Sequence, residues 1–318
     1  MKKTTAIILV CLLALTPLAA CGGDDTDSTG GNTGGAVATP APAQDAPAAT
    51  PAPAQPAPAQ PADNFDTERI IAVFTREDGS GTRDAFVSIT GVGDDMYIEA
   101  VVQNGTSQIL TGVETNETAI GYVSVGSLSP SVKALEIDGV LPSDATIVNG
   151  SYALQRPFLV VVTDEKKADP LVQDFLDFML SAEGQEISSS TWTSAVSNPA
   201  AYSPSDLSGT LKIGGSTSVD PLMQRMREAY IALNPGVVIE ISGGGSGTGI
   251  SEATSGMLDI GMSSRDLREN EKEALTDIII ALDGVAVIVN AANPLTGLTL
   301  EQVKDIFTGE STRWNQVS

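Results

Sequence analysis

The chain has 318 residues, with 17 basic and 40 acidic side chains and a formal net charge of −23. This acidity disfavours nucleic acid as a ligand, because nucleic-acid binding depends on basic patches. Any bound anion must be held by local dipoles and hydrogen bonds. The chain has no histidine, which excludes a Ser-His-Asp triad, His-ligated zinc and an imidazole base. Its two cysteines, Cys11 and Cys21, leave the rest of the chain without a disulfide or thiolate metal site.

The first residues have the three parts of a secretory signal. A basic start at Lys2 and Lys3 precedes an apolar run over 6–15 and then a stretch of small residues. The run is too short to span a bilayer comfortably. The segment Leu-Ala-Ala-Cys at 18–21 resembles the bacterial lipobox, which implies cleavage before Cys21 and lipid attachment to its thiol. An ordinary signal peptide with an incidental cysteine is the alternative. We therefore expect a lipoprotein signal peptide over 1–20 and an anchor at Cys21.

A tether is predicted over residues 21–66. It begins with Gly, Asp, Thr and Ser and continues with Pro-Ala-Gln repeats from 40 to 62. Such a composition cannot bury a core and favours extended polyproline II, at about 3.1 Å per residue. The segment would give the folded part reach from the membrane.

From residue 69 onward, short apolar runs alternate with helical patterns. The runs predict strands at 70–74, 119–123, 158–162, 211–213, 237–241, 258–261 and 284–289. Helices are predicted from Arg83, Pro170 and Pro221, and after Thr299, which has capping-box spacing to Gln302. Residues 197–209 have the composition of a connector. The pattern predicts an α/β fold with mostly parallel sheets.

Three glycine-rich loops share one design, at 78–82, 214–218 and 243–249. Each joins a strand to a helix start and supplies backbone N–H groups, small hydroxyl side chains and the positive end of a helix dipole. That combination binds tetrahedral oxyanions. Any one loop alone is explained by a helix cap and tight turn. Three at strand C-terminal ends indicate a ligand site, because ligands of open α/β sheets bind there.

Two charged residues add to this hypothesis. Arg76 is the predicted counter-charge, since its planar fork suits two phosphate oxygens, and Asp78 is predicted to orient it. A surface ion pair is the alternative for that couple. Asp259 lies in an apolar strand and is predicted to accept a proton from HPO₄²⁻ or H₂PO₄⁻. Sulfate carries no such proton, and an unpaired buried acceptor costs about 1–3 kcal/mol. A strand-end Asp capping a turn is the alternative.

These stretches resemble the phosphate-binding subunit of the bacterial phosphate ABC transporter, the PstS family. The similar segments are 76–83, 119–123, 214–221, 234–236, 243–249, 259–265 and 281–290. The resemblance implies a two-lobed periplasmic-binding-protein-like fold of type II with the ligand in the interlobe cleft. It also implies a binding protein rather than an enzyme, with no cofactor and no metal. The phosphate contacts that it implies are Arg76, Ser80, Gly81, Thr82, Thr217, Ser218, Ser246 and Asp259, supported by Asp78 and Ser216. Whether Ser218 contacts phosphate by side chain or by backbone stays open.

The order of the segments differs from the family. The stretch from 214 onward comes first in the family and the Arg76 stretch follows it, which is the pattern of a circular permutation. The former ends would be joined through about 188–209. We expect one lobe to hold 67–153 and 294–318, and the other 154–293, with hinge closure between them. A monomer is expected, and a dimer with swapped halves is the alternative.

The expected function follows from this resemblance. It is an extracytoplasmic, membrane-anchored lipoprotein that binds inorganic phosphate and delivers it to the permease subunits of an ABC transporter. The alternative is a phosphate sensor, scavenger or adhesin of the same fold without a permease. A phosphoryl-transfer enzyme is disfavoured, because the sequence has no histidine and no evident activated nucleophile or clustered metal carboxylates.

Overall fold

The computed structural model describes residues 65–317. The expectations for the signal peptide, for Cys21 and for nearly all of the tether therefore lie outside the described residues. Between residues 65 and 317, none of the helices has the length and apolar character needed to cross a membrane.

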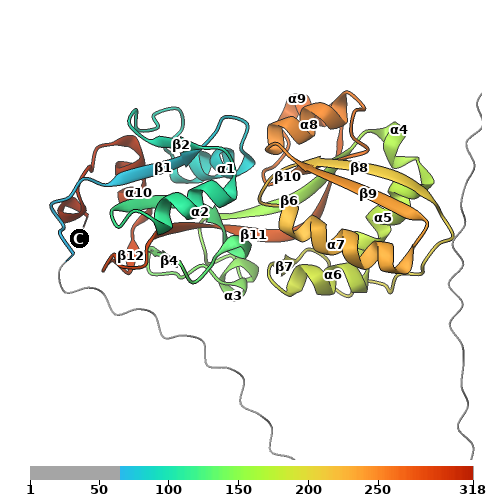
Figure 1. Cartoon of the computed structure of the whole chain (residues 1–318), viewed down its shortest axis with the longest axis horizontal. Coiled ribbons are helices and arrows are strands. Elements are labelled where there is room, and N and C mark those ends of the chain that lie inside the picture. The colour runs from blue at the N-terminus through green and yellow to red at the C-terminus, as the bar shows by residue number, and fades with distance from the viewer. Residues whose placement is uncertain (1–64, 318) are drawn as a thin grey trace, which may run out of the picture. The chain divides into compact units, whose positions relative to one another are not determined.

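Strands and helices alternate along the described chain (Figure 1). The strands are β1 (Ala72–Arg76), β2 (Val101–Gln103), β3 (Ala119–Ser124), β4 (Val132–Ala134), β5 (Glu136–Ile137), β6 (Gln155–Val162), β7 (Thr193–Ser194), β8 (Gly209–Gly215), β9 (Val237–Gly243), β10 (Ile260–Ser263), β11 (Thr276–Asn290) and β12 (Gly297–Leu298). The α-helices are α1 (Gly81–Thr90), α2 (Thr106–Glu114), α3 (Asp144–Val148), α4 (Asp164–Lys167), α5 (Pro170–Leu180), α6 (Ala182–Ser189), α7 (Asp220–Leu233), α8 (Ser246–Thr254), α9 (Glu269–Lys272) and α10 (Leu300–Thr308). Two 3₁₀ turns are η1 (Val125–Ser127) and η2 (Trp314–Gln316).

The local signals explain where several helices begin. Asp169 accepts hydrogen bonds from the amides of Leu171 and Val172, and Pro170 occupies the first position of α5. At α10, Thr299 and Gln302 form the predicted capping box. One loop expectation is only partly right, because α8 already begins at Ser246 within the glycine-rich stretch 243–249. The connector predicted over 197–209 is confirmed except at Gly209, which begins β8; residues 195–208 join β7 to β8 without regular structure.

The main sheet is mixed rather than mostly parallel. Its strand order is β2-β1-β3-β11-β6-β10-β8-β9. The outer pairs are parallel, namely β1 with β2 and β3, and β8 with β9 and β10. In the centre, β11 runs antiparallel to β3 and β6, and β6 runs antiparallel to β10. The expectation of mostly parallel sheets thus holds for the outer βαβ units and is wrong for the centre, where long strands cross between them.

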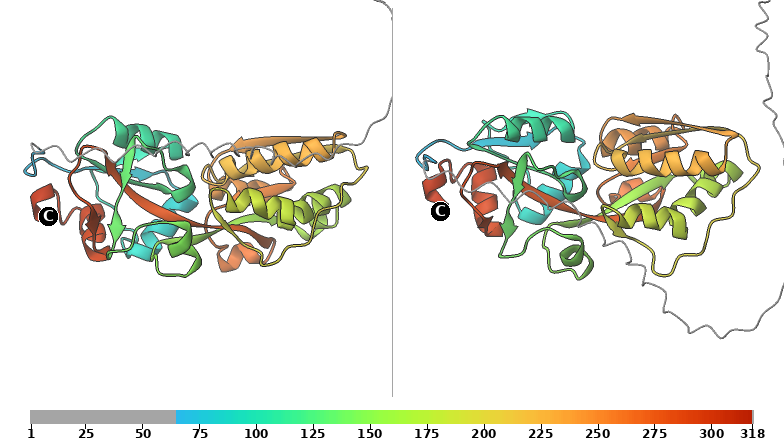
Figure 2. Two further views of the ribbon diagram at one scale, coloured as in Figure 1. Left: turned by 90° about the horizontal axis from the view of Figure 1, so that it is seen from below. Right: turned by 60° about the horizontal axis from the view of Figure 1, so that its bottom comes forward.

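Two large buried clusters divide the fold into parts that we call lobe 1 and lobe 2. The core of lobe 1 joins β1 and β3 to α1 and α10, with residues such as Ile71, Phe86 and Phe307. The core of lobe 2 joins β6, β8 and β10 to α5 and α7, with residues such as Phe175 and Met226. In Figures 1 and 2, the red strand β11 runs from lobe 2 into lobe 1.

Strand β11 contributes to the cores of both lobes, so the boundary between the lobes differs from the predicted one. Val285, Val287 and Val289 of β11 pack in the core of lobe 1, whereas Ile280 and Ala281 pack in lobe 2. The expected lobe of residues 154–293 therefore extends too far, because an apolar strand of 15 residues is long enough to enter both cores.

The two ends of the described chain meet in lobe 1. Ile70 and Arg313 form an antiparallel bridge. The amide of Ile71 donates to the carbonyl of Thr312 at 2.8 Å, and the amide of Asn315 donates to the carbonyl of Thr67 at 2.8 Å. The segment preceding β1 and the segment following α10 are thus neighbours in space.

Candidate anion-binding site

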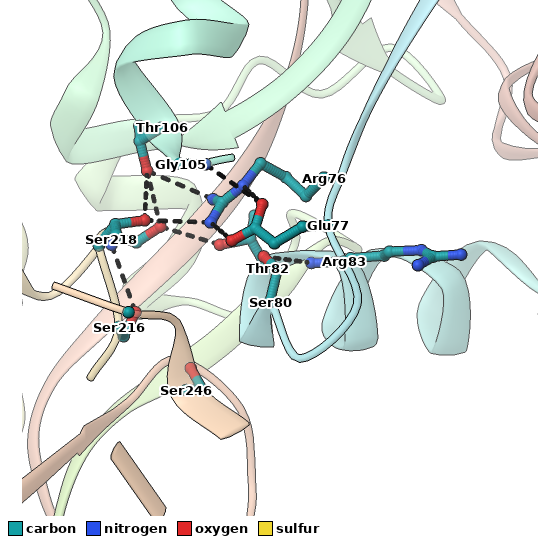
Figure 3. A network of polar contacts seen from close by, with 12 residues as sticks. Arg76, Glu77, Ser80, Thr82, Arg83, Gly105, Thr106, Ser216, Ser218 and Ser246 are labelled. Atoms are coloured by element: carbon teal, nitrogen blue, oxygen red, sulfur yellow. Dashed lines mark hydrogen bonds and ion pairs between the residues drawn. The ribbon is translucent and has the colours of Figure 1, made fainter. Parts of the chain in front are cut away.

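Arg76 is held at the end of β1 in the facing region of the two lobes, and its side chain is 2% exposed. Its Nε donates to Glu77 Oε2 at 2.8 Å and its Nη2 donates to Glu77 Oε1 at 2.7 Å. From the same guanidinium, Nη1 donates to Thr106 Oγ1 at 3.4 Å (Figure 3). Its Nη2 also donates to Thr217 Oγ1 of lobe 2 at 3.0 Å. The two parallel bonds to one carboxylate determine the plane of the guanidinium.

Glu77, rather than Asp78, is the residue that orients Arg76. Glu77 Oε2 also accepts from the amide of Gly105 at 3.2 Å. The side chain of Asp78 is 96% exposed and pairs with Arg83 instead. The prediction for Asp78 is therefore wrong. Asp78 lies in the turn closed by the Ser80 amide on the Glu77 carbonyl, which places its short side chain on the solvent side.

The electrostatics of this pair favour the ionised form of Glu77. Burial raises the pKa of the Glu77 carboxyl, but the hydrogen bonds and charge of Arg76, together with the backbone amide of Gly105, outweigh burial. The net pKa lies below the usual 4.5. The pair is thus ionised at neutral pH, and the Glu77 negative charge is used in holding Arg76.

Hydroxyl groups from both lobes surround this cation. Thr82 Oγ1 and Ser218 Oγ lie 2.8 Å apart across the interface between the lobes, and Thr106 Oγ1 lies 3.3 Å from Ser218 Oγ. Within lobe 2, Ser218 N donates to Ser216 Oγ at 3.3 Å. Each of these four side chains is buried. Hydroxyls both donate and accept, so the same groups that bond one another here can turn to an oxyanion.

Ser246 and Ser264 extend the hydroxyl cluster. The amide of Ser264 donates to Ser246 Oγ at 3.1 Å, and Ser216 Oγ donates to Ser264 Oγ at 2.9 Å. Ser264 was not among the residues predicted from sequence. It follows β10 directly, as Ser216 follows β8, so the rule that sites form at strand C-terminal ends could have found it.

Four helices begin at this cluster, and three of them lack a side-chain cap. Ser80 caps α1 by accepting from the Arg83 amide at 3.3 Å. The N-caps of α2, α7 and α8 are Gly105, Val219 and Gly245, and none makes a side-chain cap bond. Their dipoles therefore supply positive potential without a capping side chain, although the Gly247 amide of α8 and the Asp220 amide of α7 already donate to the backbone carbonyls of Gly79 and Ser216. Helix α2 and Thr106 at its start were also missed in the sequence, because the stretch carries no glycine-rich motif.

The two lobes are in close contact at Gly81. A Cβ at this position would lie 2.2 Å from Ser246 Oγ and 2.8 Å from Ser264 Oγ. The amide of Gly247 in lobe 2 donates to the carbonyl of Gly79 in lobe 1 at 2.9 Å. Side chains other than hydrogen are thus excluded at residue 81 in this closed arrangement. A cavity of about 450 Å³ opens beside the cluster and is lined in part by Thr106 and Thr217.

Asp259 is not part of this cluster. Its Oδ1 accepts from Lys166 Nζ at 2.6 Å and its Oδ2 accepts from the Lys212 amide at 2.7 Å. Asp259 precedes β10, whereas Ser264 follows it. At about 3.3 Å per residue of strand, the two ends lie well apart. The predicted role as acceptor of a ligand proton is therefore wrong. The alternative, a cap on the following turn, does not describe the residue either, because its carboxylate bonds Lys166 and the amide of Lys212 in the neighbouring strand β8.

A second buried ion pair lies behind the hydroxyls. Arg156 Nε and Nη2 donate to Asp283 Oδ2 at 3.0 and 2.9 Å, and Asp283 Oδ1 accepts from Ser124 at 2.8 Å. Arg156 Nη1 also donates to the carbonyl of Ser264 at 3.4 Å. Burial lowers the pKa of Arg156, Asp283 opposes that effect, and the charge of Arg76 adds to it. The region thus holds two guanidinium groups near each other in a strongly acidic chain.

The chain is similar to known proteins over most of the described residues. The sequence model of one protein family, described as the PBP superfamily domain, matches residues 62–183 and 200–318. Phosphate-binding protein PstS 2 of Streptococcus pneumoniae is 43% identical over 256 residues, which cover 78% of this chain and 87% of that protein. PstS 2 of Streptococcus agalactiae is 42% identical over 258 residues, or 78% and 88% of the two chains. Phosphate-binding protein PstS of Bacillus subtilis is 36% identical over 115 residues, or 35% and 38%.

A solved structure agrees with these relatives. The crystal structure of a phosphate-binding protein of a phosphate ABC transporter from Streptococcus pneumoniae has a TM-score of 0.66 and 42% identity. The match covers 79% of this chain and 100% of that one. The fold, the matched domain and the full-length relatives agree, and the chain belongs to the PstS family of phosphate-binding proteins within the PBP superfamily.

Proposed function

We propose that this protein binds inorganic phosphate between lobe 1 and lobe 2 and delivers it to an ABC transporter for import. The observation that carries the proposal is the buried Arg76 guanidinium, which Glu77 orients and which bonds Thr217 of the other lobe. A planar cation held in this way suits two oxygens of a tetrahedral anion. The printed names of the relatives describe phosphate-binding proteins and the phosphate ABC transporter.

The ligand's oxygens would replace the hydroxyl contacts that now close the cluster. Lobe 1 would contribute Arg76, Ser80, Gly81 and Thr82, and lobe 2 would contribute Thr217, Ser218 and Ser246, with Ser216 in support. We add Thr106 and Ser264, because both bond these residues directly. The uncapped starts of α2, α7 and α8 would donate backbone N–H groups. We propose a binding protein and not an enzyme, since none of these groups is paired with a base that could activate it.

The direct test is calorimetric titration of phosphate into the protein after unfolding, removal of bound ligand and refolding, with sulfate as the control. Saturable binding of one phosphate per chain, lost in Arg76→Gln, is expected. Absence of phosphate binding by well-folded wild-type protein would overturn the proposal. Delivery is tested separately, by loss of phosphate uptake when the gene is deleted and an intact permease remains.

We further propose that the protein is anchored on the extracytoplasmic face of the cell membrane by lipid on Cys21. The lipobox-like segment 18–21 and the Pro-Ala-rich segment that follows support this location. The replacement Cys21→Ser is expected to move the protein from the membrane fraction into the soluble fraction, with phosphate affinity unchanged. Membrane retention of Cys21→Ser would contradict the anchor.

The reversed order of the halves remains a proposal. The proposed reversal is relative to members such as PstS of Bacillus subtilis, which aligns over only 35% of this chain; PstS 2 of Streptococcus pneumoniae aligns over 78% and therefore has the segment order of this chain. A sequential alignment between two permuted chains covers one half at a time. The bridge between Ile70 and Arg313 brings the new ends together, as a permutation in lobe 1 requires. A chain permuted back, with residues 67 and 317 joined and a new start near 200, is expected to fold and bind phosphate; failure to fold would contradict the proposal.

A further inference from the structure

Outside the hydroxyl cluster, one carboxylate joins two cations of the opposite lobe. Asp84, in the first turn of α1, places Oδ2 2.8 Å from Arg265 Nε and 2.9 Å from Arg268 Nη2. The side chain of Arg265 is 8% exposed and that of Asp84 is 25% exposed. This arrangement is stronger than an ordinary surface pair, because one oxygen meets two positive charges and one of them is nearly buried.

The three residues belong to different lobes. On α1, Phe86 packs in the core of lobe 1. Between Arg265 and Arg268, Leu267 packs against β6 and α8 of lobe 2. The contacts of Asp84 with these arginines therefore exist only when the lobes are closed.

Both sides are also coupled in sequence to the proposed phosphate site. Asp84 is two residues from Thr82 on the same helix, and Arg265 immediately follows Ser264. A helix start and a short segment after a strand move as units, so an opening at Asp84 displaces the hydroxyls of Thr82 and Ser264 from each other as well.

The guanidinium of Arg265 is already oriented by a residue of lobe 2. Glu271 of α9 pairs with Arg265, with Oε2 2.8 Å from Nη1 and Oε1 2.8 Å from Nη2. Glu271 also accepts from the Arg268 amide at 2.8 Å. Because the guanidinium is already oriented in lobe 2, closure orders little more than the Asp84 side chain and costs correspondingly less conformational entropy.

We propose that Asp84, Arg265 and Arg268 form an interlobe latch, which holds the closed state and sets the rate at which phosphate leaves. Asp84 is a positioning residue in this role, since it acts on the ligand through the relative position of the lobes. The part of the proposal that concerns phosphate rests on the proposed function. The latch itself rests on the contacts between the lobes.

The test compares Asp84→Asn with Glu117→Gln, a matched loss of one carboxylate charge. Glu117 pairs with Arg69 at 2.9 Å, and both residues flank strands of lobe 1, so this pair does not report closure. Two rates are measured in the full chain. One is the release of labelled inorganic phosphate. The other is amide hydrogen exchange at Gly247 without phosphate, because that amide donates to Gly79 across the lobes.

In Asp84→Asn, phosphate release is expected to be roughly fivefold faster, as for the upper range of a partly exposed ion pair, with the association rate within about twofold. Exchange at Gly247 should rise in parallel. Glu117→Gln should change neither rate. Arg268→Gln removes only the exposed cation and should give a smaller increase in the rates of phosphate release and Gly247 exchange. It replaces Asp84→Asn in the test if that variant does not fold.

The outcomes separate the two proposals. Unchanged Gly247 exchange in Asp84→Asn and Arg268→Gln, relative to Glu117→Gln, would overturn the latch whatever phosphate does. Faster Gly247 exchange in a protein whose wild type binds no phosphate would keep the latch and reject the phosphate function.

Discussion

Arg76 and Thr217 are 141 residues apart in sequence and share a hydrogen bond of 3.0 Å between the lobes. Arg76 ends a strand of lobe 1, and Thr217 lies between β8 and α7 of lobe 2. Neither lobe alone can form the pair. The proposed anion site is therefore a property of closure, and substitutions can affect it either by removing a donor or by changing how the lobes meet.

The first prediction separates the two carboxylates that follow Arg76. Glu77→Gln should weaken phosphate binding by about tenfold, because a charge-assisted bond that orients the guanidinium contributes about 1.5–3 kcal/mol. Asp78→Asn is the matched control and should stay within about twofold, since the Asp78 side chain is 96% exposed. Calorimetric titration measures both. Equal losses in the two variants would contradict the assignment of the orienting role to Glu77 alone.

The ion pair of Arg76 with Glu77 is expected to make a contribution to the free energy of unfolding that is lost in acid. The folded pKa of Glu77 lies below its usual 4.5, so its stabilisation is fully present above about pH 4.5 and is lost as pH falls through the lower folded pKa. Denaturant unfolding of wild type and Glu77→Gln should differ by a constant free energy near neutral pH. The difference should shrink as the pH falls below the usual pKa of 4.5. A difference that grows on acidification would contradict the sign.

Gly81→Ala should reduce phosphate affinity without lowering stability. The new Cβ would meet Ser246 Oγ at 2.2 Å, so the closed arrangement must give way. Gly81 begins α1 without a positive φ, and alanine is the better helix former by about 0.5–1 kcal/mol. Titration should show a loss of more than about tenfold, while the thermal midpoint of the ligand-free protein stays level or rises. Unchanged affinity would show that the lobes close differently around the ligand.

Asp259→Asn should leave phosphate affinity within about twofold of wild type. It should lower the free energy of unfolding by about 1 kcal/mol, because the carboxylate pairs with Lys166 and accepts from the Lys212 amide away from the hydroxyl cluster. Titration and denaturant unfolding measure the two effects. Lys166→Gln should reproduce the stability loss, and a large loss of affinity in Asp259→Asn would restore its predicted contact with the ligand.

Several residues show how far local signals reach. Pro170 and the Thr299–Gln302 spacing predicted helix starts correctly, because caps and proline act within one turn. The hydroxyls that were predicted from glycine-rich loops, including Thr82, Ser216, Ser218 and Ser246, do lie in one cluster. The prediction for Asp259 was wrong because it depended on where β10 begins and ends. Asp259 lies just before the start of the strand, and the ends of strands are difficult to locate from sequence.

By itself, the amino-acid sequence determined the alternation of strands and helices, the three loops suited to an oxyanion, and the exclusion of histidine chemistry. These properties depend on residue type and on neighbours within a few positions. Only the tertiary structure decided that Glu77 holds Arg76, that Ser264 and Thr106 join the cluster, and that β11 belongs to both cores. Those choices depend on which side of a turn faces the other lobe and on how a long strand is shared. Both are set by packing between segments that are distant in sequence.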